Sequence, residues 1–357
     1  MGSLARVTRQ MRDGEPSEPA RDLDDVRGVG GPAGSDQPQG AGGPHIPDAR
    51  QSAAGTASPG DTARPASTGG AGQSDTPRML SPSRYLAWLY SPEAQQPVLA
   101  KLCEIESEIA GSLRPDIDHH VAHARLQWWQ EECERCAQGR PVHPLTRELV
   151  KAYGTAAAGV PSPLAGLRGF VDTAVWDLAG ATFETRKELT AYCERWAAAM
   201  FETAAGQVVS SGPGELEAVA RWRALGAAVR EIELLADLTR EAHTGRVRVP
   251  LDELDRAGVV VSSLAKPPWP APLAALLRAR HEALRATIGE SVGALGREEQ
   301  VNYRGLLVWA ALACRQSARA QRALPGIISP RRYHALAHGW QAWRAARRAA
   351  AGKLRLS

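Results

Sequence analysis

The first 78 residues of the 357-residue chain contain no Phe, Trp or Tyr. They are instead dense in Gly, Pro, Ala and Ser, as in "GGPAGSDQPQGAGGP". Such a segment cannot bury enough apolar surface to offset the conformational entropy that folding costs. We therefore predict a disordered leader over residues 1–78. Residues 79–357 are then expected to form one folded domain, because that length is sufficient for a sizeable core.

Long apolar runs are also missing. The longest, "GLLVWAALAC" at 305–314, is far shorter than the roughly 20 residues that a membrane-spanning helix needs. The N-terminus lacks the apolar core of a signal peptide, and the acids of "RDGEPSEPARDLDD" argue against a transit peptide. The five cysteines are odd in number and irregularly spaced, which favours a reducing compartment. The sequence therefore predicts a cytoplasmic protein without a spanning helix.

The charge balance argues against nucleic acid as a partner. The net charge is only +4 with a pI of about 8.9, and cations alternate with acids along most of the chain. The exception is the C-terminal segment, where basic residues accompany two tryptophans: Arg331, Arg332, Trp340, Trp343, Arg344, Arg347, Arg348 and Lys353. A basic amphipathic helix can lie on an anionic membrane surface. The alternative is the solvated face of a packed helix.

Helical periodicity dominates the segment after residue 79. Leu, Ile and Ala recur at i, i+3 and i+4 in almost every stretch, and Ser or Pro often stands where a helix would begin. The only alternation of period two is the short "RVRVP" at 246–250. We therefore predict an all-α fold.

One predicted helix carries charge along a single line. At about 100° per residue, a polar stripe runs along "LGAAVREIELLADLTREAH" between two apolar flanks; it consists of Gly226, Arg230, Glu233, Asp237 and Glu241. Ionised groups in such a setting must be paired, bound to metal or exposed to a wet cavity. Two hypotheses follow: an internal line of salt bridges, or a cavity wall that presents carboxylates to a divalent cation.

The same segment supports a resemblance to a known family. "LGAAVREIELLADLTREAHTGRVRVP" at 225–250 resembles the second acidic segment of the squalene/phytoene synthase family, LG-x-A-x-Q-x-x-N-I-L-R-D-x-x-E-D-x-x-x-G-R-x-Y-L-P. "WDLAGATFETRKELTAYC" at 176–193 resembles another segment of that family. "ARLQWWQ" at 124–130 and "WQAWRAAR" at 340–347 resemble a bacterial branch of it. The resemblance covers residues 80–350, nearly all of the predicted domain.

The resemblance implies an isoprenoid-synthase-like helical bundle around a central cavity. In active members, acidic motifs on two facing helices bind Mg²⁺, which holds the diphosphates of prenyl donors. Carried onto this chain, the metal-binding residues are Glu104, Glu108, Glu233, Asp237 and Glu241. The catalytic residues among them are Glu108, Asp237 and Glu241. The implied substrate-binding residues are Asp177, Tyr192, Arg230 and Arg246.

Several positions depart from the family pattern. The first acidic motif, C-R-x-x-D-D-x-x-D, reads "CEIESEIAG" from Cys103, so that only Glu108 keeps its acid. Arg230 replaces Gln, Glu233 replaces Asn and Arg248 replaces Tyr in the second motif. Arg230 could therefore neutralise the acids in place of Mg²⁺. A glycine-containing segment has become "WAAAMF" at 196–201.

These departures leave two functional hypotheses. The first is a Mg²⁺-dependent transferase that joins prenyl diphosphates head to head. The second is a non-catalytic relative that binds a prenyl lipid, or acts as an assembly or interaction factor, because the losses resemble a branch that includes mitochondrial complex I assembly factors.

Two further motifs have plainer interpretations. His119 and His123 have the spacing of helical zinc ligands, but the glutamate of a zincin is missing. A polar helix start, with Asp116 or Asp118 as N-cap, is the expected alternative. Cys133 and Cys136 form a C-x-x-C without a second pair, which predicts free thiols.

Overall fold

The computed structural model describes residues 81–154, 163–206, 215–327 and 335–356. The predicted leader, residues 1–78, lies outside these ranges, as do Arg331 and Arg332 of the basic C-terminal segment. The chain divides into two units, residues 1–71 and 72–357, and every described residue belongs to the second.

All regular elements in the described residues are helical, which confirms the all-α prediction. The α-helices are α1 (Pro82–Tyr90), α2 (Gln96–Ala110), α3 (His119–Ala137), α4 (Pro144–Tyr153), α5 (Arg168–Leu178), α6 (Arg186–Ala197), α7 (Thr203–Ala205), α8 (Glu215–Ala236), α9 (Leu238–His243), α10 (Leu251–Arg256), α11 (Ala271–Gly293), α12 (Arg297–Asn302), α13 (Arg304–Ala323) and α14 (Ala335–Ala350). The shorter helical turns are η1 (Glu93–Gln95), η2 (Gly111–Leu113), η3 (Pro163–Leu167), η4 (Ala198–Glu202) and η5 (Val261–Ala265).

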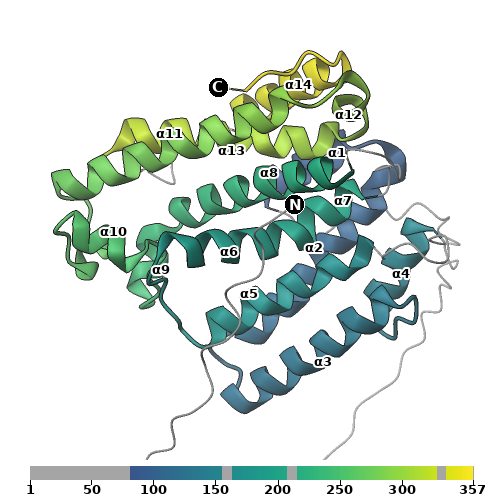
Figure 1. Cartoon of the computed structure of the whole chain (residues 1–357), viewed down its shortest axis with the longest axis horizontal. Coiled ribbons are helices and arrows are strands. Elements are labelled where there is room, and N and C mark those ends of the chain that lie inside the picture. Colours follow the sequence, from purple (N-terminus) through teal and green to yellow (C-terminus); the bar gives the residue numbers. More distant parts are fainter. Residues whose placement is uncertain (1–80, 155–162, 207–214, 328–334, 357) are drawn as a thin grey trace, which may run out of the picture. The chain divides into compact units, whose positions relative to one another are not determined.

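Helix α8, which carries the polar stripe, packs against α6, α11, α13 and η4 (Figure 1). Gly226 permits the close approach of α8 to η4. A Cβ atom at position 226 would lie 2.8 Å from the Cβ and Cγ atoms of Phe201 and 2.9 Å from the Cβ of Ala197. Because real Cβ atoms do not approach other carbons so closely, any other residue would push α8 away from η4.

The helix predicted through the polar stripe is interrupted at Asp237. The Asp237 N–H is shared between the carbonyls of Glu233 and Leu234, at 3.3 and 3.2 Å, which tightens the last turn of α8. After α9, Gly245 takes a φ of 82°, and the Arg246 N–H donates to the Glu241 carbonyl at 2.9 Å. This closing turn keeps Arg246 beside the last acid of the stripe.

The segment "WAAAMF" contains a π-helical turn, η4. Its Phe201 is fully buried, and the ring centroid lies 5.2 Å from that of Trp309 and 6.1 Å from that of Trp196. The turn therefore directs a large aromatic side chain into the interior, between α6 and α13.

Helix α14 packs on α1 and α13 through a face of small residues. The alanines of this face are buried: Ala342, Ala345, Ala346 and Ala349. Beyond the helix, the Leu354 N–H donates to the buried Oε1 of Gln300 at 2.9 Å. These contacts fasten α14 and the residues after it to the rest of the unit.

The remaining sequence predictions concern thiols, caps and membrane spans. All five cysteines are free and buried, which confirms the prediction for Cys133 and Cys136; burial raises the pKa of both to about 12. Asp118 caps α3 by accepting from the His120 and Val121 N–H groups, as expected of a polar helix start. No helix in the described part of the chain is long and apolar enough to cross a membrane.

Candidate ligand pocket

A large pocket runs along the face of α8 that carries the polar stripe. Its volume is about 1250 Å³, somewhat larger than an ordinary small-molecule site. Glu233, Asp237 and Glu241 all line it, so the acids of the stripe face a hollow, as one of the two hypotheses predicts. Apolar side chains supply much of the remaining wall: Leu113, Leu234, Leu235, Trp269, Leu277, Leu312, Leu324 and Ile327.

Glu233 lies between two arginines and a tryptophan. Its Oε2 is 3.5 Å from Nη2 of Arg84 on α1 and 3.4 Å from Nη1 of Arg230. Its Oε1 accepts from Trp309 Nε1 at 3.1 Å. Both carboxylate oxygens of Glu233 therefore already have donors from the protein.

A second carboxylate, Glu106 of α2, binds Arg84 as well but does not line the pocket. It forms an ion pair with Arg84 and accepts from Trp196 Nε1 at 2.7 Å. The guanidinium of Arg84 lies 5.0 Å from the ring centroid of Trp309, and that of Arg230 lies 5.1 Å from that of Trp196. Burial alone would raise the pKa of Glu106, but Arg84 and Arg230 outweigh burial and lower it.

Arg248 links Glu241, the last acid of the stripe, to Asp177 of α5. It is buried, and its Nη2 lies 3.0 Å from Glu241 Oε2 while its Nη1 lies 2.7 Å from Asp177 Oδ1. Tyr192 donates to the other oxygen of Asp177 at 3.0 Å. The expectation that Tyr192 contacts substrate is therefore corrected: its side chain is buried behind Asp177 and does not line the pocket.

Asp237, between these two clusters, is the most open acid of the stripe. Its Oδ2 lies 2.7 Å from Nη2 of Arg240, and both side chains are more than half exposed. Partial burial raises the pKa of Asp237; Arg240 opposes this rise, and Glu241 and Glu233 add to it. Arg246, one-third exposed, lies 3.7 Å from Glu241 and lines the pocket; its role in substrate binding stays a prediction.

The opposite wall carries no carboxylate from α2. The α2 and η2 region contributes Ala110, Leu113 and Arg114 to the pocket. Glu104 instead shares Lys101 with Glu148 of α4, at 2.8 and 2.6 Å. Glu108 is exposed and does not line the pocket. The prediction that Glu104 and Glu108 face the stripe is therefore wrong, because the helical phase of α2 turns them away from it.

Comparisons with known proteins agree with this architecture. The model of the squalene/phytoene synthase family matches residues 78–337. The chain belongs to this family. Among solved structures, a dehydrosqualene synthase in complex with ligand is 17% identical, with a TM-score of 0.58 over 75% of this chain and 90% of that one. The squalene synthase HpnC from Alicyclobacillus acidocaldarius is also 17% identical, with a TM-score of 0.55 over 68% and 89%. A comparison with curated proteins found no match.

The family's magnesium does not fit the residues that this squalene/phytoene synthase-family chain presents. Mg²⁺ requires several oxygen ligands in near-octahedral geometry at about 2.1 Å. Glu233, Asp237 and Glu241 each lie within ion-pair distance of at least one arginine. The α2 and η2 region, which would have to supply a second set of acids, contributes Arg114 to the pocket and no carboxylate. No group of three or more His, Cys, Asp or Glu residues suited to a metal occurs in the described ranges.

Arginine dominates the pocket instead. Among the described residues, four carboxylates line it: Asp177, Glu233, Asp237 and Glu241. Eight arginines line it: Arg84, Arg114, Arg230, Arg240, Arg246, Arg248, Arg315 and Arg319. The pKa of Arg315 is lowered by partial burial and by the nearby Arg319 and Arg322. The α13 side of the pocket is therefore strongly electropositive.

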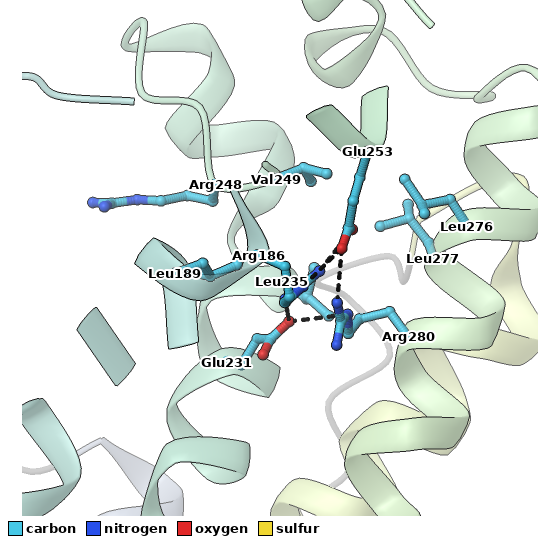
Figure 2. Close-up of a pocket in the computed structure, with 10 residues that line it drawn as sticks. All are labelled: Arg186, Leu189, Glu231, Leu235, Arg248, Val249, Glu253, Leu276, Leu277 and Arg280. Atoms are coloured by element: carbon cyan, nitrogen blue, oxygen red, sulfur yellow. Dashed lines mark hydrogen bonds and ion pairs between the residues drawn. The ribbon is translucent and has the colours of Figure 1, made fainter. Parts of the chain in front are cut away.

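A second charged cluster surrounds a small gap beside the pocket, and Leu235, Arg248 and Leu277 line both the gap and the pocket. This ionic ring consists of Arg186, Glu231, Arg280 and Glu253, and Figure 2 shows the four side chains converging. Arg186 contacts Glu231 and Glu253 at 2.6 and 2.7 Å. Arg280 contacts the same two acids at 3.2 and 3.1 Å. Two cations and two anions thus join α6, α8, α10 and α11, leaving a gap of only about 10 Å³.

Sequence reasoning missed Arg84 and Glu106, the partners of the stripe. The missing signal was the phase of α2. Leu99, Cys103, Glu106 and Ala110 recur at i, i+4, i+7 and i+11, which places Glu106 on the same face as two buried residues. The prediction followed the alignment with the family's first acidic motif instead, and that alignment pointed to Glu104 and Glu108.

Proposed function

We propose that this protein binds a prenyl ligand with an anionic head in the pocket, and that arginines rather than Mg²⁺ hold the head. The observation that carries the proposal is that every carboxylate lining the pocket is paired with an arginine. Arg315 has no hydrogen bond or ion pair within the described residues, and the partner of Arg114, Asp116, is 3.8 Å away and largely exposed. These two cations are available to an anion.

The apolar part of the wall supports the same proposal. Leucines from α8, α11 and α13 line the pocket beside the arginines. An isoprenoid chain can contact these side chains while a phosphate or diphosphate is held by guanidinium groups, which bind phosphates in bidentate geometry. The pocket therefore combines the two chemistries that a prenyl phosphate presents.

A titration tests the proposal directly. The intact protein is titrated with geranylgeranyl diphosphate and with farnesyl diphosphate, once in EDTA and once with Mg²⁺, and heat or tryptophan fluorescence is recorded. We expect saturable binding in EDTA, changed little by Mg²⁺. Binding that requires Mg²⁺, or no binding of either compound, would contradict the arginine-held head. Inorganic pyrophosphate and geranylgeraniol serve as controls, because each presents only one half of the ligand.

A head-to-head transferase is the second candidate, and one observation favours it. Asp237 remains in the pocket, and its only ion-pair partner in the described residues is the exposed Arg240. Exposed pairs of this kind contribute about 0–1 kcal/mol, so that Asp237 can exchange its partner. This candidate predicts pyrophosphate release from prenyl diphosphates with Mg²⁺, abolished in Asp237→Ala. If neither substrate releases pyrophosphate, the transferase candidate is wrong and only the binding function remains.

The prenyl chain of the proposed ligand favours work near a membrane. Prenyl chains partition into bilayers, because each buried CH₂ group contributes about 0.8 kcal/mol. We therefore also propose membrane contact, through the C-terminal helix that the sequence marks as basic. The role of an assembly or interaction factor predicts instead that a protein partner binds whether or not the pocket holds a ligand.

A further inference from the structure

The charge of the chain is divided unevenly along its length. All 39 acidic residues precede residue 300, whereas eleven of the 43 Lys and Arg residues lie in residues 300–357. The remaining 32 cations and the 39 acids leave residues 1–299 with a formal charge of −7, against +11 for residues 300–357. An asymmetry of this size indicates an anionic partner for the C-terminal part.

Helix α14 presents an unusual outer face within that part. Leu336 is 91% exposed and Trp340 is 57% exposed. Trp343 stacks on Trp340 with ring centroids 4.6 Å apart, and the guanidinium of Arg347 lies 5.0 Å from the Trp343 ring. At about 100° per residue, these side chains and Arg344 fall in one sector, opposite the buried alanines. We call this set of five residues the docking face.

The helix that carries the docking face also reaches the pocket. His338 lies in the first turn of α14 together with Leu336, and His338 lines the pocket. Ile327, which is 49% exposed, lines it as well. Helix α14 therefore contributes one side chain to the pocket while its docking face points the other way.

We infer that the docking face lies on an anionic lipid bilayer, with Trp340 and Leu336 in the headgroup region and Arg344 and Arg347 on lipid phosphates. Adjacent tryptophan and arginine side chains suit the headgroup region of a bilayer. The indole ring favours this partly apolar layer, and the guanidinium group binds the lipid phosphates there. A second copy of the chain is a poor occupant, because two segments of charge +11 would be brought together. This inference rests on the membrane contact proposed above and specifies its residues, but it does not depend on which ligand the pocket binds.

Vesicle cosedimentation of the full chain tests the docking face. The vesicles contain phosphatidylcholine alone, or phosphatidylcholine mixed with phosphatidylglycerol. We expect binding to the mixed vesicles only, weakened by salt. Leu336→Ala with Trp340→Ala should weaken binding about tenfold or more. Arg344→Ala and Arg347→Ala should each weaken it roughly fivefold.

The control is Trp128→Ala on α3, because Trp128 is also partly exposed, at 39%, and lies outside the basic segment. It should bind vesicles like the unmodified protein. Unchanged binding by the Leu336→Ala, Trp340→Ala variant, equal binding to neutral vesicles, or no binding at all would overturn the inference. Self-association that disappears in this variant would overturn it in favour of a second copy.

Titration of the docking-face variants with geranylgeranyl diphosphate in vesicle-free buffer separates the two proposals. These variants should bind the soluble ligand normally, since the substituted side chains do not line the pocket. If the unmodified protein binds vesicles but not geranylgeranyl diphosphate, the docking face is supported and the proposed ligand is wrong. If it binds geranylgeranyl diphosphate but not vesicles, the proposed ligand is supported and the docking face is wrong.

Discussion

The ionic ring and the pocket lie side by side and use the same residue types for different ends. In the ring, two arginines meet two glutamates, and hardly any space remains between them. In the pocket, eight arginines meet four acids around about 1250 Å³. A balanced, closed cluster has nothing left to offer a ligand, whereas an unbalanced, open one retains a potential that an anion can satisfy. A structural ionic cluster therefore differs from a ligand-binding pocket in its balance of charges and in its free volume, not in the presence of charged residues.

The largest effect is expected in the ring. Arg186→Leu removes one of the two arginines that both glutamates share, and leaving buried charge underpaired costs about 3–5 kcal/mol. Urea unfolding at pH 7 should show this loss in the free energy of unfolding. The double variant Arg186→Leu, Glu253→Leu keeps Arg280 paired with Glu231 and should recover part of it. If the single variant unfolds like the unmodified protein, the ring does not support the fold.

An intermediate effect is expected at His281, which follows Arg280 in α11 but lines the pocket. Burial, helped by Arg285, lowers the pKa of His281 to about 4. An unfolded histidine has a pKa of about 6.5, so that acid protonates the unfolded chain first. The stability contributed by neutral His281 is present above pH 6.5 and is lost as the pH falls towards 4, by up to about 3 kcal/mol.

His281→Gln removes this titration and keeps a side chain that can bond to Ser317, the present partner of His281 at 3.0 Å. The loss of stability between pH 7 and pH 4 should be smaller in the variant, measured by urea unfolding at both values. Equal losses would mean that His281 titrates normally in the folded protein.

The smallest effect on stability and a clear effect on binding are expected at Arg315. Arg315→Ala should change the free energy of unfolding by less than about 0.5 kcal/mol. It should weaken geranylgeranyl diphosphate binding in EDTA about tenfold, or about 1.4 kcal/mol. Arg322→Ala is the matched control, because Arg322 lies two turns further along α13 and does not line the pocket. Equal weakening by both variants would indicate a diffuse field rather than a contact.

Much of the fold followed from periodicity. The helical spacing predicted the all-α architecture, and the angular position of Glu233, Asp237 and Glu241 predicted that they share one face towards a hollow. Both inferences depend on local geometry, which a sequence encodes directly. The break at Asp237 was missed because a bifurcated hydrogen bond has no signature in residue type.

The partners of the stripe were harder to predict. Arg84 reaches Glu233 from 149 positions away, and Arg248 reaches Asp177 across 71. Such pairs depend on how helices pack, which a single sequence does not determine. Glu104 and Glu108 were misplaced for a different reason: the motif register was preferred to the helical phase, although the phase was readable and would have selected Glu106.

The π-helical turn at Ala198–Glu202 sets the position of the Phe201 ring between Trp196 and Trp309. This position therefore depends on the number of residues in the turn. Deleting one residue from the run Ala197–Ala199 would let the backbone continue as an α-helix. The side chains that follow would then rotate by about 100°, and Phe201 would leave its position between the two indole rings. Insertions and deletions of one alanine, which change no chemistry, could therefore reshape the interior of this protein more than most substitutions within it.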